Sequence, residues 1–549
     1  SINDTLTNSG TIIGTGGTAV DMSVGDDTAN LLSGSSITGN VDGGAGTDTV
    51  NLTGSGNITN GILLNFETIE KSGTGTFTLG GGLSSGNHIS VFGGVIRANG
   101  AFAHEAGATY TVGAGADGNL GKISAETATI KGGTVALDTV IGARGGTHSI
   151  VGTDSGLTGT YDLFSAATDS DYIAAALSYD ANNAYITLTS NFAGAALTEN
   201  QQAVATSLDA TYSTASGDML NVYGAISTLS TPAIRLAYDQ MGGASHTAFA
   251  AIDVYRVASF YRNLFRSTPS SPTGTSVTGT YFPALFAANT AVTSDAVSVP
   301  SAKMKGRRDG PFLLWIRGYE ASGNRDGDDI ASRYDFTIGG TVAGIEYRVG
   351  PAIRAGAAFG YSRTNVDMKD LQDCGNEDSY QGSLYGSFTS TDKRWYVNAA
   401  LGYSMNKYNM KRSLSFGTIS RTARSSYDGS DISGHVESGY LLPFKAVSIT
   451  PYVSFLALDS RRDGFTESGA DALNLIGDSA RTTSLQGSLG IGLAKEFVIN
   501  KTFFLTPEIS ARWVHEFGDT NAVLDARFAG APSGSFRVSS DTWARDSGV

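Results

Sequence analysis

The residues that most resemble a ligand site are Gly43-Gly44-Ala45-Gly46-Thr47-Asp48-Thr49-Val50. They fit a calcium-binding nonapeptide, in which glycines make a turn and the aspartate supplies oxygen ligands. Such sites need tandem copies nine residues apart, because one turn supplies only half of the ligands. The matching aspartate here, Asp27, lies a whole repeat of 21 residues away. The pattern therefore favours a β-helix turn over calcium, and we expect no metal and no cofactor.

Two further patterns could do chemistry. Gly82–Gly86 fits the nucleophile motif G-x-S-x-G, and Gly113–Gly118 fits the dinucleotide motif G-x-G-x-x-G. Neither lies between a strand and a helix, which both chemistries require. The chain has 71 glycines, so chance matches are expected, and its six histidines lack metal-binding spacing. We predict that the chain is not an enzyme.

Composition narrows the class of protein. The formal net charge is −14, which argues against a nucleic-acid partner because phosphate binding needs clustered Lys and Arg. No run of 18 apolar residues is present, so no transmembrane helix is expected, whereas a transmembrane β-barrel stays possible. Cys374 is the only cysteine, so no intrachain disulfide can form.

A charged helix is predicted over residues 244–266. It carries Asp253, Arg256 and Arg262 among aromatic residues, and as a helix it would be about 35 Å long. A helix that is only partly apolar cannot face lipid, but it could run inside a polar-lined pore. The alternative is an amphipathic surface helix that packs outside the pore as a cap.

Charged residues at inward positions of predicted barrel strands would line such a pore. They are Glu346, Arg348, Arg354, Glu437, Glu508 and Arg512. Glu346, Glu437 and Glu508 are the expected partners of Arg256 and Arg262. A confined lumen would make such ion pairs count for more than surface pairs.

The N-terminal third repeats itself. Gly25-Asp26-Asp27-Thr28 continues to Ile37-Thr38, and Gly46-Thr47-Asp48-Thr49 continues to Ile58-Thr59 with the same offsets. A period near 20 residues, built of short β runs and glycine turns, indicates a solenoid whose coils bury their inward Leu, Ile and Val on one another. The pattern becomes helical after residue 192, and residues 267–310 read as a Ser/Thr/Ala/Gly linker.

Residues 311–549 alternate between apolar and small or polar side chains, as in Ala343–Val349 and Ile353–Ser362. A soluble sandwich would alternate too, so the connections decide. Short turns are predicted near 350–351, 391–393, 443–445 and 499–501, and long polar loops at 320–333, 363–378, 405–430, 459–480 and 518–535. Strict short-long alternation is typical of an outer-membrane barrel.

The chain at this point resembles the autotransporters, the type V self-secretion family. The resemblance rests on the order and spacing of several segments along the chain. They are Leu177–Leu188, Asn200–Ala205, Ser216-Gly217-Asp218, Asp239–Gly243, Tyr334–Thr337, Gly344–Arg348 and Ala358–Ser362.

The resemblance implies a mainly β protein with a right-handed parallel β-helix, short helices and a twelve-stranded antiparallel transmembrane barrel. The expected divisions are 1–94 for the passenger coils, 95–192 for a segment that nucleates passenger folding, 193–266 for helices including a pore helix, 267–310 for a linker and 311–549 for the barrel. The barrel would be monomeric and inserted in outer-membrane lipid by periplasmic chaperones and the barrel-assembly machinery.

The implied function is secretion and display of the chain's own passenger at the cell surface. The alternative is a surface adhesin or enzyme whose active part lies upstream of residue 1. One departure stands out, since nine strands are counted before Phe517 instead of twelve. A sheet of nine strands would leave an unpaired strand edge in lipid, which is energetically prohibited. We therefore expect that the barrel is incomplete at its C-terminal end and lacks about three strands.

Overall fold

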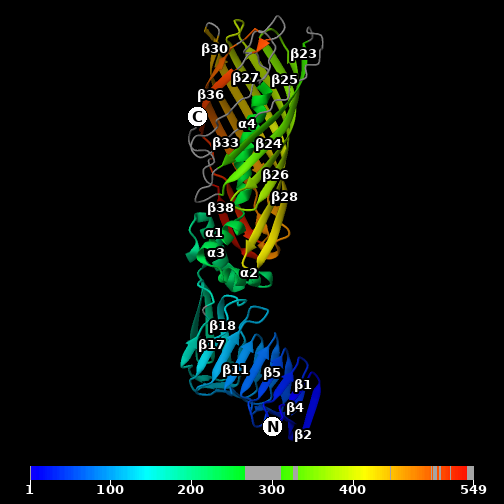
Figure 1. Cartoon of the computed structure of the whole chain (residues 1–549), viewed down its shortest axis with the longest axis vertical. Coiled ribbons are helices and arrows are strands. Elements are labelled where there is room, and N and C mark those ends of the chain that lie inside the picture. Colours follow the sequence, from blue (N-terminus) through cyan, green and yellow to red (C-terminus); the bar gives the residue numbers. More distant parts are fainter. Residues whose placement is uncertain are drawn as a thin grey trace.

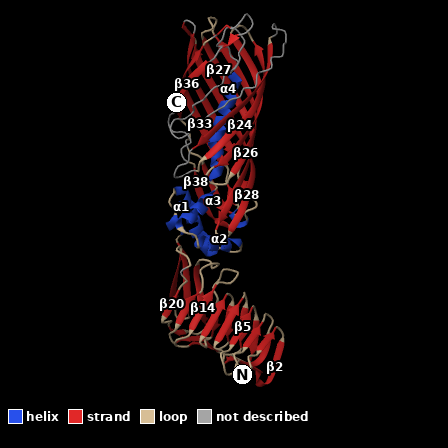
Figure 2. Cartoon of the chain, viewed as in Figure 1, coloured by secondary structure: helices blue, strands red, loops and turns tan. Residues whose placement is uncertain are grey.

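The computed structural model describes residues 2–167, 169–265, 311–325, 332–444, 447–495, 497–498, 504–505, 508–519 and 521–540. A solenoid of strands, a group of helices and a tall antiparallel sheet follow one another along a rod (Figure 1). Figure 2 shows the same order by secondary structure.

Strands of successive coils stack in parallel into three sheets, the second of which ends in the antiparallel strands β22 and β21. The first contains β1 (Thr5–Asn8), β3 (Thr28–Leu31), β5 (Thr49–Thr53), β8 (Thr68–Ser72), β11 (His88–Phe92), β14 (Thr109–Gly113), β17 (Thr134–Leu137) and β20 (Leu163–Ser165). The second contains β2 (Thr11–Asp21), β4 (Ser36–Asp42), β6 (Gly56–Thr59), β9 (Thr76–Leu79), β12 (Val95–Ala98), β15 (Lys122–Ala125), β18 (Gly146–Thr153), β22 (Asn183–Ser190) and β21 (Ile173–Tyr179), with β7 (Leu63–Leu64) paired to β4. The third contains β10 (Leu83–Ser84), β13 (Ala101–His104), β16 (Thr127–Ile130) and β19 (Leu157–Gly159).

The sequence repeat sets the register of these coils. Ala29 pairs with Val50, and Val50 pairs with Ile69, and all three side chains are buried in the solenoid. The outward Thr28 and Thr49 pair in the same way one residue earlier. Alternation places apolar side chains inside and polar ones outside, so each coil covers the core of the next. The predicted solenoid is confirmed.

The helices follow the last coil. They are η1 (Phe192–Ala195), α1 (Glu199–Thr211), η2 (Tyr212–Thr214), α2 (Asp218–Ser227), α3 (Thr231–Gly242), η3 (Ala244–Thr247) and α4 (Ala248–Phe265). Thr198 begins α1 with a capping box to Gln201, and Gly243 ends α3 in the left-handed region at φ 68°. No helix in the described part of the chain is long and apolar enough to cross a membrane.

The C-terminal sheet runs antiparallel in chain order and curls around α4. Its path is β23 (Phe312–Arg325), β24 (Tyr334–Arg348), β25 (Ile353–Met368), β26 (Cys374–Thr389), β27 (Trp395–Phe416), β28 (Ile419–Tyr440), β30 (Val447–Arg462), β33 (Ala480–Ala494) and β36 (Glu508–Glu516). Two short hairpin pieces accompany it, β29 (Leu442–Phe444) on β30 and the pair β34 (Phe497–Val498) and β35 (Phe504–Leu505). Within the described residues β23 and β36 are the two ends of this path.

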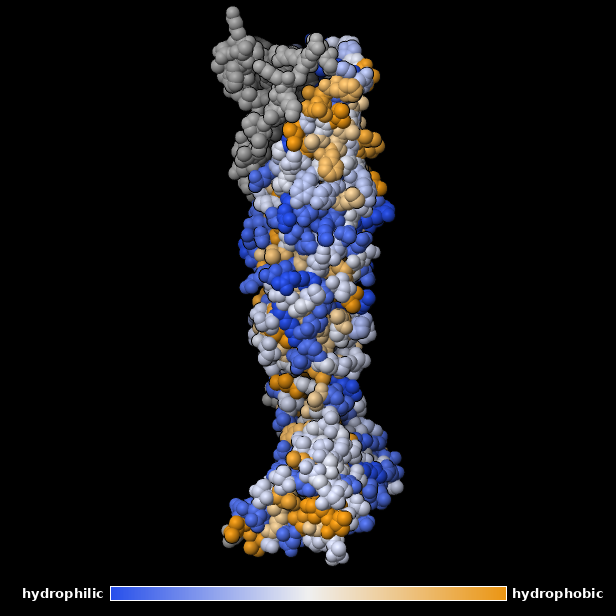
Figure 3. All heavy atoms as spheres, turned by 90° about the vertical axis from the view of Figure 1, so that its right-hand side faces the viewer, coloured by the Kyte–Doolittle hydropathy of each residue, from blue (hydrophilic) through white to orange (hydrophobic). Residues whose placement is uncertain are grey.

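The outer face of this sheet is apolar over only part of its height. On β27, Leu401 is 72% exposed and Met405 is 59% exposed, whereas the outward positions that follow are Lys407, Asn409 and Lys411. The apolar stretch from Trp395 to Met405 is about as long as a membrane-spanning strand of 9–11 residues. Figure 3 shows orange surface on the upper part of the barrel and mainly blue surface below it, with further orange surface at the lower end of the molecule.

The connections differ from the expected polar loops. β27 and β28 continue to Phe416 and Ile419, so the predicted loop 405–430 is a long hairpin with a tight turn. β25 and β26 likewise fill most of the predicted loop 363–378. The loop prediction was wrong there because polar outward residues were taken for loop, while inward residues such as Tyr408 and Leu414 continue the alternation and are buried.

Strands also occupy parts of the loops predicted at 459–480 and 518–535. They are β31 (Phe465–Thr466), β32 (Leu475–Gly477), β37 (Val523–Phe528) and β38 (Ala531–Ser539), with η4 (Asp471–Leu473) between the first two. We call these four strands the small sheet, in the order β31-β32-β37-β38. Its sheet pairing joins segments far apart in sequence, which no local pattern reveals.

Candidate functional site

The candidate site is the interior of the curled sheet, which α4 fills. Figures 1 and 2 show α4 running lengthwise among the strands. The inward face of the strands is polar and buried, as Ser379, Gln381 and Ser383 on β26 illustrate, while the neighbouring outward Leu384 is 70% exposed. A polar interior with an apolar exterior is the arrangement of a membrane barrel and the reverse of a soluble sandwich.

Arg256 of α4 is the centre of the charged contacts in this interior. Its guanidinium forms ion pairs with Asp431 on β28, with Glu377 on β26 at 2.8 Å and with Asp253 on its own helix at 3.5 Å. It also donates to the Ser379 hydroxyl at 2.8 Å. All these side chains are buried. Because several carboxylates surround a buried guanidinium, the helix is held at one height and one rotation in the barrel.

Asp253 of α4 accepts hydrogen bonds from two further strands of the wall. The Tyr408 hydroxyl on β27 donates to its two carboxylate oxygens at 3.1 Å each, and the Ser460 hydroxyl on β30 donates at 3.2 Å. Arg256 and Asp253 therefore bind four consecutive strands of the wall, β26, β27, β28 and β30. The neighbouring turns of α4 carry aromatic rings that contact the wall, including Phe249 on Tyr408 at 5.1 Å between centroids.

Glycines on the wall make room for the rings of α4. A Cβ at Gly360 would lie 2.6 Å from a ring carbon of Phe260, and a Cβ at Gly402 would lie 2.7 Å from the Tyr261 hydroxyl. The Tyr261 hydroxyl instead contacts the Ser433 hydroxyl at 2.8 Å. Small wall residues opposite large helix residues indicate an interior shaped around this helix.

The last turn of α4 lies near the short turns between strands. Phe265 contacts the rings of Tyr385 and His435, with centroids 6.1 and 5.7 Å apart. Arg317 of β23 donates to the carbonyl oxygens of Asn263 and Leu264, the second at 3.3 Å. A cation at the carbonyl end of a helix satisfies groups that have no partner within the helix.

The expected partners of Arg256 were wrong. Arg256 pairs with Glu377, Asp431 and Asp253, whereas Glu346 pairs with Arg354 of the neighbouring strand at 3.4 Å. The reason is height, because Glu346 and Arg354 lie beside the short turn that joins β24 to β25, far along their strands from the level of Arg256.

The other predicted lumen residues are placed as follows. Glu437 is half-buried and accepts a hydrogen bond from the Tyr396 hydroxyl at 3.0 Å. Arg512 is half-buried on β36, Arg348 is exposed at the end of β24, and Arg262 is half-buried on the last turns of α4. Glu508 begins β36, and its side chain lies outside the described part of the chain.

Sequence reasoning missed the wall residues that hold the helix. Glu377 fell inside the predicted loop 363–378, and Asp431 followed the predicted loop 405–430 directly. A signal was present, because Glu377 continues the inward series of Ser379, Gln381 and Ser383 at every second position. Extending the alternation into the supposed loops would have found it.

The calcium-like motif has a different use in the β-helix. The Asp48 carboxylate accepts a hydrogen bond from the Asp27 amide of the previous coil at 2.8 Å, and Asp27 accepts from the Asp4 amide at 2.6 Å. The Glu67 carboxylate in turn accepts a hydrogen bond from the Asp48 amide at 2.8 Å. Burial raises the pKa of Asp48. Within the described residues no group of three or more potential metal ligands is found.

Comparison with known proteins agrees with this geometry. A family model described as the autotransporter β-domain matches residues 314–549, the region of the curled sheet. The chain carries an autotransporter β-domain. Its relatives include an extracellular serine protease of Serratia marcescens, 25% identical over 239 residues that cover 43% of this chain and 22% of the relative. Esterase EstA of Pseudomonas aeruginosa is 28% identical over 200 residues, which cover 36% of this chain and 28% of the esterase.

The chain thus spans about a quarter of the length of these curated relatives. Among solved structures, the translocator domain of autotransporter NalP from Neisseria meningitidis aligns with 42% of this chain and 85% of that chain, at 16% identity and a TM-score of 0.30. In this β-domain, the described interior side chains contact α4.

Proposed function

We propose that this protein is an outer-membrane translocator that secretes its own β-helical passenger and displays it at the cell surface. The observation that carries the proposal is the continuous path of the chain. The last coil of the β-helix leads through α1–α3 into α4, and α4 lies inside the β-domain. A helix that enters the lumen from the passenger side and ends near the short turns is the remnant of the route the passenger took.

The apolar part of the outer face of the sheet, which includes Trp395 to Met405 of β27 and is here called the apolar belt, supports an orientation. At the end of the barrel that faces α1–α3, charged outward residues mark the limit of the belt. They include the pairs Arg363–Asp378 at 3.3 Å and Arg481–Asp459 at 2.8 Å. The rings of Tyr361 and Tyr380 contact each other just inside this limit, tilted by 42° with centroids 5.2 Å apart. Aromatic residues at the headgroup level followed by charges mark a membrane interface. The β-helix, α1–α3 and the small sheet are then outside the cell, and the short turns face the periplasm.

The division of the chain is part of the same proposal. Residues 1–94 are passenger coils, 95–192 nucleate passenger folding, 193–266 contain the pore helix, 267–310 link it to the barrel and 311–549 form the barrel. Folding of residues 95–192 outside would prevent the chain from sliding back, because a folded coil is too wide for a lumen that fits one helix. Insertion of the barrel by chaperones and the barrel-assembly machinery completes the proposal.

A second candidate concerns the passenger itself. The two relatives named above are a protease and an esterase, which suggests that autotransporter β-domains carry enzymes as well as other cargo. We propose no catalytic role for residues 1–192, because the motif that most resembles a site there, around Asp48, binds backbone amides of neighbouring coils. An adhesive or enzymatic activity would then belong to passenger sequence upstream.

Thiol labelling on intact cells tests the orientation. Cys374 is the first residue of β26, at the end of the barrel that faces α1–α3, and it is half-buried. A membrane-impermeant maleimide should therefore label it on intact cells. The matched control is Lys393→Cys in a Cys374→Ser background, because Lys393 is exposed in the short turn between β26 and β27. This control should be labelled only after the outer membrane is permeabilised. The opposite pair of results would refute the topology.

A further inference from the structure

The helices α1–α3 with η3 (Glu199–Thr247), here called the stem cap, contact parts of the barrel beyond the apolar belt. These parts are the long hairpin of β27 and β28 and the small sheet, here called the barrel arms. Figure 1 shows the two arms beside the stem cap, between the β-helix and the barrel. The contacts between stem cap and arms involve three different helices and none of the residues of α4.

Arg412 of β27 binds the end of α3. Its side chain is fully buried and donates to the carbonyl oxygens of Gln240 at 2.6 Å and Met241 at 3.2 Å. The same guanidinium holds Glu467 in two bonds of 3.1 and 2.6 Å and donates to the Leu473 carbonyl at 3.0 Å. One side chain therefore joins the last carbonyls of α3 to both arms, where a cation is favoured at a helix C-terminus.

The chain turns into the pore directly after this contact. The Ser245 hydroxyl donates to Asp373 at 2.9 Å, and the His246 ring stacks on Phe465 of the small sheet with centroids 4.2 Å apart. Gly243 supplies the left-handed φ of 68° that the turn needs, and a Cβ there would lie 2.4 Å from Leu475. The turn is thus fitted between the small sheet and the connection from β25 to β26.

Asp218 at the start of α2 makes a second ionic contact. Arg421 of β28 donates to both of its oxygens, at 2.5 and 2.7 Å, and the Ala472 amide donates at 3.1 Å. The bond from Arg421 lowers the pKa of Asp218 to about 2. The pair is therefore charged at neutral pH, with geometry that favours a strong contact.

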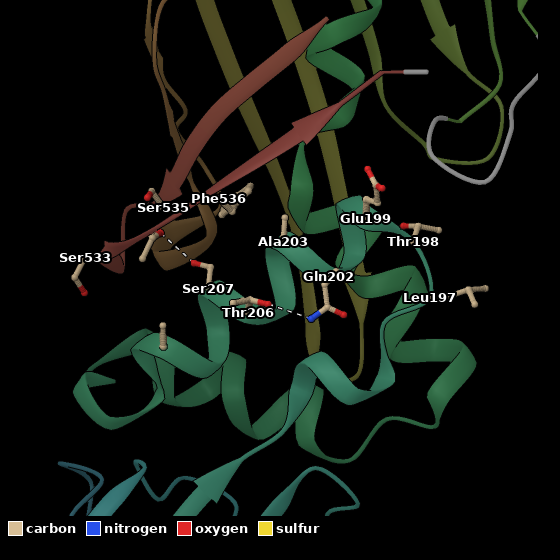
Figure 4. A pocket seen from close by; sticks show the side chains of 12 residues that line it. Leu197, Thr198, Glu199, Gln202, Ala203, Thr206, Ser207, Ser533, Ser535 and Phe536 are labelled. Carbon is tan, nitrogen blue, oxygen red and sulfur yellow. Dashed lines mark hydrogen bonds between the residues drawn. The ribbon is translucent and has the colours of Figure 1, made fainter. Parts of the chain in front are cut away.

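The third contact joins α1 to the small sheet. Asn200 donates from its side-chain amide to the Ser539 carbonyl and accepts from the Ser539 amide, both at 2.8 Å. It satisfies the edge of β38 as a neighbouring strand would. The Ser207 hydroxyl donates to the Gly534 carbonyl at 3.0 Å, and Figure 4 shows Ser207 directed at the hairpin that carries Ser533 and Ser535.

We propose that the stem cap and the barrel arms form a second, non-covalent anchor that retains the passenger on the cell surface independently of the chain that runs through the pore. The proposal rests on the proposed function, because it presumes that the passenger has reached the outside. Its partner surface is the arms of the same chain. The anchor consists of the partly exposed pair Arg421–Asp218, the α3 carbonyls bound by the buried Arg412, and the edge of β38. Desolvated polar groups of this kind are costly to leave without partners.

A cut after α4 removes the covalent link to the barrel, so that only the contacts of α4 in the lumen and those of the stem cap still hold the passenger. A site for a specific protease is inserted between Phe265 and Phe312, and the purified full-length protein in detergent is cut there. The fraction of passenger that stays with the barrel is followed over time by size-exclusion chromatography. The anchor predicts that the cut wild type stays together, and that Asp218→Ala and Arg412→Ala each release the passenger at least tenfold faster.

Controls keep the result specific. Glu199→Ala removes an exposed carboxylate from α1 for which no ion pair is found within the described residues, and it should release at the wild-type rate. Arg256→Ala weakens the pore contact, and it should still be retained by the anchor. If Asp218→Ala and Arg412→Ala release no faster than Glu199→Ala, or if the cut wild type falls apart at once, the anchor is wrong.

Surface display of each variant is measured on intact cells before the cut. Normal display with fast release in the variants supports the anchor, while the proposed function is unaffected. Failure of the uncut wild type to display its passenger overturns the proposed function instead. Asp218→Ala is the safer variant for folding because Asp218 is partly exposed, whereas Arg412 is fully buried. A heat-dependent shift in gel mobility confirms that each barrel is folded.

Discussion

The β-helix and the barrel use the same strand periodicity with opposite faces inside. In the β-helix Val50 is buried and Thr49 faces outward, whereas in the barrel Ser383 is buried and Leu384 is 70% exposed. Alternation alone therefore does not tell a soluble strand from a membrane strand. The two kinds of strand differ in what their interiors contact. The interior of the β-helix packs against other coils, whereas the interior of the barrel contacts a polar helix.

The largest expected effect comes from emptying the β-helix core. Phe77 is fully buried, so Phe77→Ala should lower the free energy of unfolding of the passenger by about 3–5 kcal/mol through lost burial and the cavity left behind. The matched change Leu401→Ala, on the barrel exterior, leaves no cavity because lipid fills the space. Its cost should be clearly smaller, at roughly 25 cal/mol per Å² of lost apolar burial. Urea unfolding followed by circular dichroism measures the first, and barrel gel mobility the second.

Equal effects of these two changes would contradict the comparison, since they would mean that Leu401 is packed against protein.

The next effect comes from placing a charge on each exterior. Leu401→Arg puts an arginine on the apolar belt, at a cost of roughly 2–4 kcal/mol near the bilayer midplane. Thr49→Arg puts the same side chain on the outer face of the β-helix, where surface changes stay within about 0.5 kcal/mol. The first should reduce the amount of folded barrel in the membrane, and the second should leave display unchanged. A tolerated arginine at Leu401 would show that this face is not in lipid.

A smaller effect concerns pH and lies in the stem cap between the two regions. Burial raises the pKa of Asp239 to about 6, although the Gln201 side chain donates to both of its oxygens at 3.1 Å. A carboxyl whose folded pKa is raised favours folding most when it is protonated, so this contribution is lost as pH rises from about 4 to 6. The change should amount to about 1–3 kcal/mol.

Hydrogen exchange of the α1 and α3 amides, corrected for the intrinsic rate, measures this local stability. Protection in the wild type should decline between pH 4 and 6, and Asp239→Asn should remove the decline. A decline that persists in Asp239→Asn would assign the pH dependence to another group.

The smallest expected effect is the response to calcium. Asp27 and Asp48 already accept the amides of neighbouring coils, so a chelator should leave the thermal unfolding midpoint of the passenger unchanged. A large calcium-dependent shift would mean that the nonapeptide pattern around Asp48 binds the ion after all.

Much of the fold was predictable from sequence because its signals are local and periodic. The repeat of Asp27 at Asp48 gives the stacking of coils, and the alternation around Leu384 gives the barrel strands. The short turns at 350–351 and 391–393 were also placed correctly, since Arg348 and Ile353 flank the first, and Thr389 and Trp395 the second.

The site was harder to predict, because contacts across a lumen have no local signature. The charged helix itself was recognised from its length and its Arg and Asp residues, yet its partners were misassigned. Glu377 and Asp431 lie far from Arg256 in sequence, and only the barrel register decides which wall residues share its height. The small sheet was missed for the same reason, because β32 and β37 pair across many residues.

The central claim is that α4 occupies the barrel lumen, and a cysteine pair tests it directly. In a Cys374→Ser background, Phe260→Cys on α4 is combined with Gly360→Cys on the inward face of β25, or with Phe359→Cys on its outward face as the matched control. A short thiol crosslinker is added to cells that display the full-length protein, and crosslinking is read from gel mobility. The account predicts a crosslink for the Gly360 pair and none for the Phe359 pair. Crosslinking of the Phe359 pair alone, or of neither pair while α4 cysteines crosslink to the barrel arms, would contradict it.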